Sequence, residues 1–320
     1  MDFLKRFQDD VGLLDIAQQK IVVNKDIIVT PYRVDHSAYD SYMYMIKCDD
    51  KTILHTGDFR THGWTGKGVM KLLKHYVKKV DVLICEGTML SREYEDMFTE
   101  KDLEDAARNI MALNEKVFVL CSSTNIDSIA SFYQAAMDNG RLIYADKYQI
   151  LNLDIVTESK ADNTNTHEKY DFSRQKVFPY TDNNPKLHDF MNDKGFCMFI
   201  RVNKQVMSDF EKALKRFPNN VIIYSLWEGY LKKDKPYADE NIISFLDRAV
   251  KLYGSEINMK HTSGHAYPNA IVDVCNEVKP DIIIPIHSEK PDEFEKFKDM
   301  GKIKQGVVKR FTGDKSTIVI

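Results

Sequence analysis

The stretch DVLICEG, residues 81–87, decides the fold. Its centre, from Val82 to Cys85, is apolar at every position, and a short apolar run bounded by polar residues is typical of a β-strand that is buried on both faces. Strands of this kind belong to parallel sheets that are flanked by helices. The run ends on Glu86, and α/β folds place their sites at the carboxyl ends of such strands. The stretch therefore predicts an α/β fold with a candidate site at one sheet edge.

Strand patterns also precede this stretch, at residues 26–34, 42–48 and 51–58, and a helical pattern covers residues 67–80. After about residue 100, helices and strands alternate, which favours a second, mostly parallel sheet. A polar stretch at 159–170 is expected to be a surface loop. The remaining expected helices are 103–113, 126–137, 207–217, 242–253 and 268–278, and the remaining strands are 117–121, 142–144, 196–200, 221–225, 257–260 and 282–286.

The composition is that of an ordinary soluble protein. The chain has 320 residues, of which 43% are hydrophobic and 29% charged, enough to build a sizeable core. A net charge of −3 excludes a surface that is cationic throughout, so any nucleic-acid binding must use a local patch. The five cysteines form no C-x-x-C pair and predict reduced thiols in a cytoplasmic protein. No apolar run is long enough to span a membrane, so we expect no membrane partner.

Several residues that can bind metal or transfer protons stand at the ends of apolar runs. One polar residue at a strand end is ordinarily a satisfied structural group, but a set of them in one chain predicts a site. Imidazole and carboxylate are zinc ligands, and zinc-bound water ionises near pH 7, so the set predicts a hydrolytic metal site. No H-E-x-x-H motif is present. The residues are His36, His55, Asp58, Glu86, His265 and His287.

A family resemblance follows from five segments taken in order. They are TPYRVDHSAYDSYMYMI (30–46), ILHTGDFR (53–60), VLICEGTMLSR (82–92), HTSGHA (261–266) and IIIPIHSEK (282–290). Together they resemble the later motifs of the β-CASP metallo-β-lactamase-fold hydrolases, of the ribonuclease J kind. The resemblance implies a partial metallo-β-lactamase αββα core over 1–95 and 256–320, with an inserted β-CASP α/β domain over 96–255.

The resemblance also implies roles for residues. His36, Asp58 and His287 resemble ligands of the family's two zinc ions, with Asp58 bridging them. His265 resembles the motif B histidine, which protonates the leaving oxygen or holds the scissile phosphate, and Glu86 stands where the family has its motif A acid. Residues expected to contact substrate or its phosphate are Ser263, Gly264, His261, Ser122 and Ser123.

One departure from the family concerns the H-x-H-x-D-H motif, which normally precedes the segment around His36. No H-x-H occurs in this chain, and only 35 residues precede His36. The chain is therefore expected to be an N-terminally truncated fragment, one half of a two-chain protein, or a metal-poor derivative. A second departure is Ser288, where ribonuclease J usually has glycine.

The resulting expectation is a zinc-dependent nuclease of RNA processing, which hydrolyses phosphodiester bonds of single-stranded RNA with metal-bound hydroxide. An alternative is an inactive fragment, a partner-dependent half-protein or a nucleic-acid-binding remnant, and a further one is a hydrolase of small esters or lactams. The expected partners are RNA and either a second copy or the missing N-terminal half. A core without its first strands exposes apolar surface, so we also expect self-association.

Overall fold

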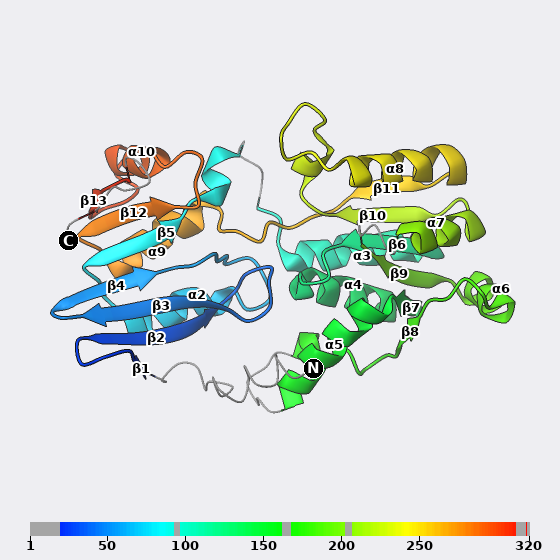
Figure 1. The fold of residues 1–320 in the computed structure, drawn as a ribbon, viewed down its shortest axis with the longest axis horizontal. Helices are drawn as coiled ribbons and strands as arrows, with labels where there is room; N and C mark the ends of the chain where they lie inside the picture. The colour runs from blue at the N-terminus through cyan, green and yellow to red at the C-terminus, as the bar shows by residue number, and fades with distance from the viewer. Residues whose placement is uncertain (1–19, 93–96, 162–167, 202–206, 312–317, 319–320) are drawn as a thin grey trace. The chain divides into compact units, whose positions relative to one another are not determined.

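The computed structural model describes residues 20–92, 97–161, 168–201, 207–311 and 318, and these residues form two compact units (Figure 1). The first unit contains the described residues of Met1–His36, Asp40–Met97 and Gly264–Ile320. The second contains Ser37–Tyr39 and the described residues of Phe98–Ser263. Both units combine a β-sheet with helices, so the expected α/β class is confirmed.

The first unit is built on a seven-stranded sheet in the order β1-β2-β3-β4-β5-β12-β13. Strands β1 to β4 are antiparallel neighbours, whereas β4, β5, β12 and β13 run parallel. The stretch that opened the sequence analysis is the central strand β5, between β4 and β12. The strands are β1 (Ile21–Val22), β2 (Ile27–Val34), β3 (Ser41–Cys48), β4 (Lys51–His55), β5 (Val82–Glu86), β12 (Ile282–Ile286) and β13 (Val307–Val308).

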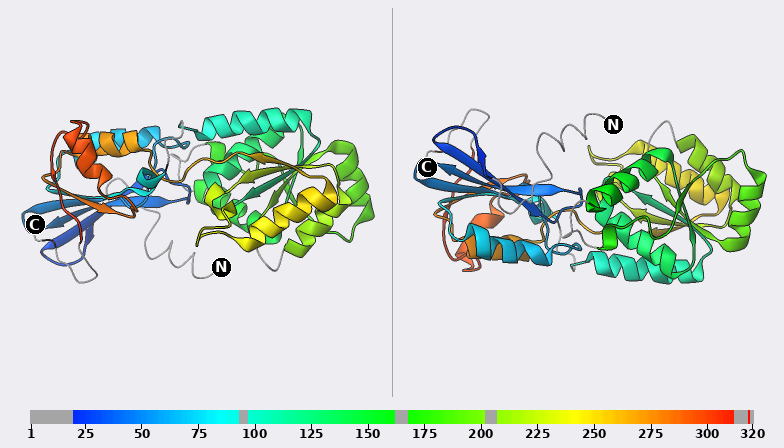
Figure 2. Two further views of the ribbon diagram at one scale, coloured as in Figure 1. Left: turned by 90° about the horizontal axis from the view of Figure 1, so that it is seen from above. Right: turned by 90° about the horizontal axis from the view of Figure 1, so that it is seen from below.

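The described helices of this unit cover one face of its sheet (Figure 2). They are α2 (Lys67–Leu72), which continues as a π-helix over Leu73–Val77, α9 (Pro268–Val278) and α10 (Glu293–Asp299). Alternate strand residues point into the core beneath them, among them Met43, Leu54, Leu83 and Ile283, all of which are fully buried.

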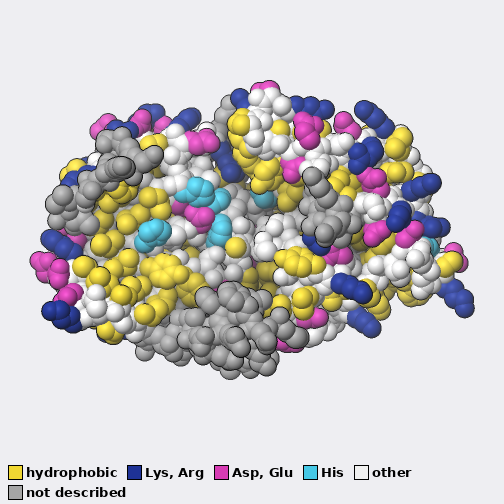
Figure 3. Space-filling view, viewed as in Figure 1, with side chains coloured by type: hydrophobic (Ala, Val, Ile, Leu, Met, Phe, Trp, Pro, Cys, Tyr) yellow, Lys and Arg dark blue, Asp and Glu magenta, His cyan; other side chains and the backbone are white. Residues whose placement is uncertain are grey.

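The other face of the same sheet is also apolar. Ile46 of β3 pairs in register with Ile53 of β4, which pairs with Val82 of β5, which in turn pairs with Ile282 of β12. These residues alternate with those that face the helices, so they form one apolar row across the opposite face. No helix among the described residues lies on this face, and Figure 3 shows hydrophobic side chains spread over this part of the molecule.

The second unit is a six-stranded parallel sheet with helices on both faces (Figure 2). The strand order is β11-β10-β6-β9-β7-β8, and each neighbouring pair of strands is parallel. The strands are β6 (Lys116–Cys121), β7 (Leu142–Ala145), β8 (Val177–Pro179), β9 (Phe196–Ile200), β10 (Val221–Ser225) and β11 (Glu256–Met259). The helices are α3 (Glu100–Leu113), α4 (Ile126–Asp138), α5 (Lys147–Ala161), α6 (Pro185–Lys194), α7 (Met207–Arg216) and α8 (Glu240–Tyr253).

The structure adds two helices that the hydrophobic pattern did not indicate, α5 and α6. The apolar residues of α5 are scattered around the helix, so they give no stripe of helical period. Helix α6 is short and polar, and its signal is local: Asn184 caps it and Pro185 occupies its first turn. Of the expected loop at 159–170, residues 162–167 lie outside the described part of the chain.

The border between the units also differs from the expected one. Strand β11 pairs with β10 in the second sheet, so the second unit runs to Ser263 and not to residue 255. The motif HTSGHA therefore spans the border, with His261 to Ser263 in the second unit and Gly264 to Ala266 in the first. Within the described part of the chain, no helix is both long and apolar enough to cross a membrane.

The two faces of the first sheet give a paired prediction. Replacing both Ile46 and Ile53 by Thr keeps β-branched side chains but removes apolar surface, so binding of a hydrophobic dye and self-association should both fall. In contrast, Leu54→Ala, on the helix-covered face, should lower the free energy of unfolding by ~2–5 kcal/mol. Dye fluorescence, light scattering and urea denaturation measure the three effects. Unchanged dye binding in the Ile46/Ile53 variant would show that the face is already covered.

Candidate functional site

Four side chains of the first unit converge at one sheet edge. Asp58, Glu86, His265 and His287 each offer one potential ligand atom, and these atoms all lie within 4.8 Å of one another. Asp58 follows β4, Glu86 ends β5, His287 follows β12, and His265 precedes α9. Figure 3 shows histidine and acidic side chains grouped together on the first unit.

Strand register explains why residues so distant in sequence meet. His55 pairs with Ile84 across β4 and β5, and Glu86 pairs with Ile286 across β5 and β12. These three parallel strands therefore end at the same edge. A tight turn then brings Asp58 to this edge: Gly57 has φ +55, and a side chain there would meet the carbonyl oxygen of Tyr42 at 2.8 Å.

Glu86 and His265 are in direct contact although 179 residues separate them. His265 Nδ1 lies 3.0 Å from Oε2 of Glu86. The Glu86 side chain is fully buried, and its Oε1 accepts the backbone N–H of Phe59 at 2.8 Å and that of Ala266 at 3.4 Å. A carboxylate only accepts hydrogen bonds, so the Nδ1–H of His265 is the donor to Glu86. The Nε2 atom on the other side of the ring is then left for another partner.

His287 and Asp58 form the second pair. His287 Nδ1 lies 2.9 Å from Oδ1 of Asp58, and both side chains are more than one-third exposed. The backbone of His287 has a φ of +45, a conformation that non-glycine residues rarely adopt. The Thr88 hydroxyl donates to the His287 carbonyl oxygen at 3.1 Å and lies 3.2 Å from Nδ1. Thr88 thus holds both the backbone and the ring of His287.

His36 lies next to this group but is not one of its four members. Its ring centroid is 5.2 Å from that of His265, which in turn is 5.2 Å from that of His287. His36 Nδ1 lies 2.6 Å from the carbonyl oxygen of Gly264, so this nitrogen carries the proton and Nε2 keeps its lone pair. Burial lowers the pKa of His36, and the hydrogen bond to Gly264 opposes that effect. Of the three expected metal ligands, Asp58 and His287 belong to the four-residue group, whereas His36 lies outside it, next to His265.

The remaining predicted contact residues belong to the second unit, apart from Gly264. Ser263 and the neighbouring Thr262 are buried, and the Thr262 hydroxyl donates to Oε1 of Glu100 at 2.8 Å. Ser122 Oγ lies 3.0 Å from Thr124 Oγ1 in the loop before α4. Ser123 is buried, and its hydroxyl has no hydrogen-bond partner among the described residues. His261 lies in the loop that follows β11.

The groups that position these residues carry no clear signal in the sequence. Asp35, next to His36, and Arg60, two residues after Asp58, form an ion pair at 2.9 Å with side chains at most 1% exposed. The Arg60 backbone N–H also donates to the Asp35 carbonyl oxygen at 2.7 Å. The pair therefore joins the segments that carry His36 and Asp58. The only signal in the sequence was the presence of opposite charges beside two candidate ligands.

The donor set suits a zinc ion. Imidazole nitrogen and carboxylate oxygen are both zinc ligands, and the Nδ1 atoms of His36, His265 and His287 already contact a carbonyl or a carboxylate. Metal-binding histidines ordinarily donate their second ring nitrogen in this way, which fixes the tautomer and leaves Nε2 as the ligand atom.

The buried ion pair should be essential to folding. Arg60→Met leaves the Asp35 carboxylate buried without its cation, and breaking such a pair costs ~3–5 kcal/mol of unfolding free energy. The matched control is Arg33→Met, because Arg33 and Asp40 form a 3.6 Å pair with side chains 28% and 43% exposed. That variant should lose no more than ~1 kcal/mol. Equal losses in urea denaturation would show that Asp35–Arg60 has no special role.

Comparison with known proteins gives matches of three kinds: to a family model, to a curated protein and to solved structures. Residues 254–308 match the family model described as RMMBL, Zn-dependent metallo-hydrolase RNA specificity domain. The chain is 22% identical over 269 residues to "Ribonuclease J" of Mycoplasma pneumoniae, an alignment that covers 81% of this chain and 45% of that protein. The chain thus spans less than half the length of this curated relative.

A solved structure gives the third match, a protein of unknown function from Enterococcus faecalis V583. Its TM-score is 0.65 at 18% sequence identity, and the match covers 93% of this chain and 65% of that chain. At this identity the likeness concerns the fold alone. The matched segment 254–308 contains His265 and His287, and the five sequence segments of the expected family occur in order along the chain. The RNA specificity domain match and the ribonuclease J relative together support a ribonuclease J-like, β-CASP assignment for this chain.

Proposed function

We propose that this chain belongs to a metal-dependent hydrolase that cleaves phosphodiester bonds in single-stranded RNA. The observation that carries the proposal is the pairing at one sheet edge of two histidines with two carboxylates, His265 with Glu86 and His287 with Asp58. The matches to an RNA specificity domain and to a ribonuclease J support RNA as the substrate class.

Asp58 and His287 would hold zinc, and His36 would add a third ligand from the neighbouring ring. A bound zinc ion supplies an activated water near neutral pH and offsets negative charge on the phosphate. The more exposed carboxylate suits this role, because Asp58 is 36% exposed and can reach an ion without breaking buried hydrogen bonds. A second zinc ion, as the family has, would share Asp58.

His265 would act as the general acid. Glu86 accepts the Nδ1 proton and so fixes the orientation of the ring, which leaves Nε2 as the atom that would deliver a proton to the leaving oxygen of the phosphodiester. Glu86 keeps the ring in this orientation because its own position is fixed by the N–H groups of Phe59 and Ala266.

Substrate phosphates would contact Ser263, the backbone of Gly264, His261, and the loop of Ser122 and Ser123. The loop precedes α4, and a helix N-terminus with nearby hydroxyls favours anions. Support comes from Ser123, because a buried hydroxyl without a described partner is a donor that a ligand oxygen can satisfy.

A second candidate is a half-protein that acts only with a partner. The observation that favours it is the row of Ile46, Ile53 and Ile282, which are only partly buried and lie beside the fully buried Val82 on the sheet face that carries no described helix. A polypeptide that covers this face would also lie on the sheet that bears Glu86 and His287, so it could complete the ligand set.

The cleavage assay uses the purified chain, added zinc or manganese, and a labelled single-stranded RNA. Removal of the general acid by His265→Ala should slow cleavage by ~10²–10⁴-fold. The control is His75→Ala, an exposed histidine in the helical segment after α2, which should cleave at the parent rate. If the parent chain does not cleave RNA alone but does so with an added H-x-H-x-D-H segment, the half-protein candidate holds. Cleavage that survives His265→Ala would refute the assignment of the acid.

Thr88 should affect metal affinity without touching the metal. Thr88→Val keeps the side-chain shape but removes the hydroxyl that holds His287, so zinc affinity should fall ~10–100-fold, as for other partners of metal ligands. Thr88→Ser should restore most of the affinity. Zinc titration against a competing chelator measures this directly, and no difference between Val and Ser would exclude the positioning role.

A further inference from the structure

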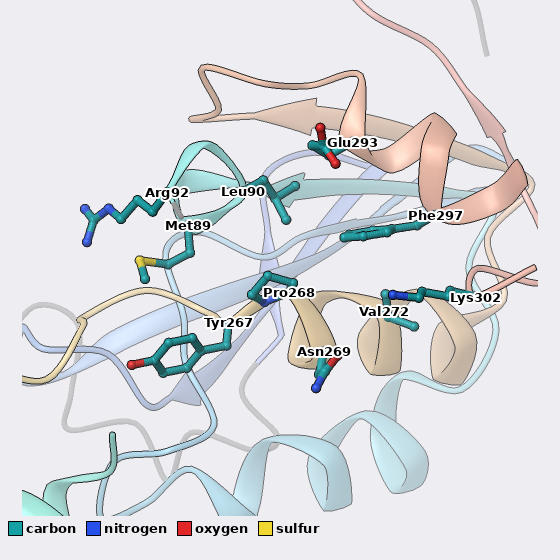
Figure 4. A pocket seen from close by; sticks show the side chains of 10 residues that line it. All are labelled: Met89, Leu90, Arg92, Tyr267, Pro268, Asn269, Val272, Glu293, Phe297 and Lys302. Carbon is teal, nitrogen blue, oxygen red and sulfur yellow. The ribbon is translucent and has the colours of Figure 1, made fainter. Parts of the chain in front are cut away.

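A cavity of about 200 Å³ lies in the first unit, between the turn after β5, the start of α9 and α10 (Figure 4). Met89 and Leu90 on its wall directly follow Thr88, whose hydroxyl contacts His287. Tyr267 and Pro268 on the opposite wall follow His265 within three residues. The cavity is therefore lined by chain segments that lead within three residues to His265 and to Thr88, the residue that contacts His287. It is called the side pocket below.

The side pocket has an apolar interior and charges at its rim. Leu90, Pro268 and Phe297 form apolar walls, and Figure 4 shows the Phe297 ring and the Leu90 side chain lying between α10 and α9. Arg92 and Lys302 bring positive charge, and the Lys302 ammonium lies 5.4 Å from the centroid of the Phe297 ring.

We propose that the side pocket binds one nucleobase of the RNA, next to the phosphate that is cleaved, and this inference rests on the proposed function. Pockets for drug-sized ligands measure ~300–1,000 Å³, so this smaller cavity suits a single flat ring system. Aromatic and apolar walls favour base stacking, and two cations at the rim favour the attached phosphates. A free phosphate would leave the apolar walls unused, and an apolar side chain of a protein would leave the cations unused.

Glu293 gives the pocket a preference among bases. Its carboxylate is 23% exposed, lines the cavity, and pairs with Lys296 at 2.6 Å. A carboxylate oxygen accepts hydrogen bonds from an exocyclic amino group, which adenine, cytosine and guanine have. Uracil instead presents carbonyl oxygens on both sides of its N–H, and the carboxylate repels them. Uracil should therefore bind most weakly.

The test measures nucleotide binding to the full-length chain in the absence of metal. Methyl-labelled Met89, Leu90 and Val272 line the pocket and report binding by NMR. AMP, CMP and GMP should shift these signals, UMP should shift them less, and ribose 5-phosphate, which lacks a base, should leave them unchanged at the same concentration. Equal shifts with ribose 5-phosphate would show that only phosphate binds and would overturn the proposal.

Two pairs of variants test the walls. Asn269→Trp places a large ring at the exposed start of α9 and should weaken AMP binding about tenfold or more, the equivalent of ~1.4 kcal/mol. Its control is Asp273→Trp, at an exposed position of the same helix that does not line the cavity. Glu293→Gln should narrow the difference between AMP and UMP, whereas Glu295→Gln, on the same helix but outside the pocket, should not.

The base-binding pocket and the hydrolase assignment can be refuted independently of each other. If nucleotides shift the pocket methyls in a chain that cleaves no RNA under any condition, the pocket stands and the hydrolase assignment falls. If the chain cleaves RNA through His265 but no nucleotide shifts Met89, Leu90 or Val272, the hydrolase assignment stands and the base-binding pocket is wrong.

Discussion

The candidate site depends above all on one buried carboxylate, that of Glu86. A fully buried charge is tolerated only when its hydrogen bonds are satisfied, and here the partners come from different segments: Phe59 after β4, and His265 and Ala266 before α9. The Glu86 backbone N–H is held in turn by the Thr56 hydroxyl at 3.2 Å. Because the penalty of an unpaired buried carboxylate falls on any arrangement that separates these segments, the folded state holds them together. The same requirement that stabilises the fold therefore sets the geometry of His265.

A second buried charge extends this frame to the other ligands. The ion pair of Asp35 with Arg60 joins the end of β2 to the loop that carries Asp58. The space around it is fully used, since a side chain at Gly63 would meet the Asp35 carboxylate at 2.3 Å and one at Gly66 would meet it at 2.8 Å. Close packing of this kind transmits strain, so a change far from the candidate metal ligands can move them. The Asp35–Arg60 pair holds the backbone near His36 and Asp58 in place. The His36 imidazole and the Asp58 carboxylate, which are the groups that would bind a metal ion, are not members of this pair.

The sequence was sufficient for the features that depend on local pattern. The strand at 82–86 was predicted because a short run of apolar residues is stable only when it is buried. Glu86, His265 and His287 were identified because each ends such a run or belongs to a motif. The pattern did not reveal Arg60, Thr88 or Glu100. Their roles arise from contacts with residues 25, 199 and 162 positions away in the chain, which no local signal records. Helix α5 was missed for a different reason: Leu153 and Val156 are buried, but Tyr148 and Leu151 lie exposed on the same helix, so its apolar residues form no single stripe.

The Glu86 and Asp58 carboxylates differ in burial, and this difference suggests different roles for their partners His265 and His287. Both His265 and His287 direct Nδ1 at a carboxylate oxygen, at 3.0 and 2.9 Å, so their local geometry is nearly the same. Glu86, however, is fully buried and committed to backbone N–H groups, and releasing it to bind a metal ion would leave those groups unpaired. Asp58 is 36% exposed and can exchange its partner for an ion at little cost. Two similar pairs thus suit different proposed roles: the buried one orients the His265 ring, and the exposed one is available to a metal.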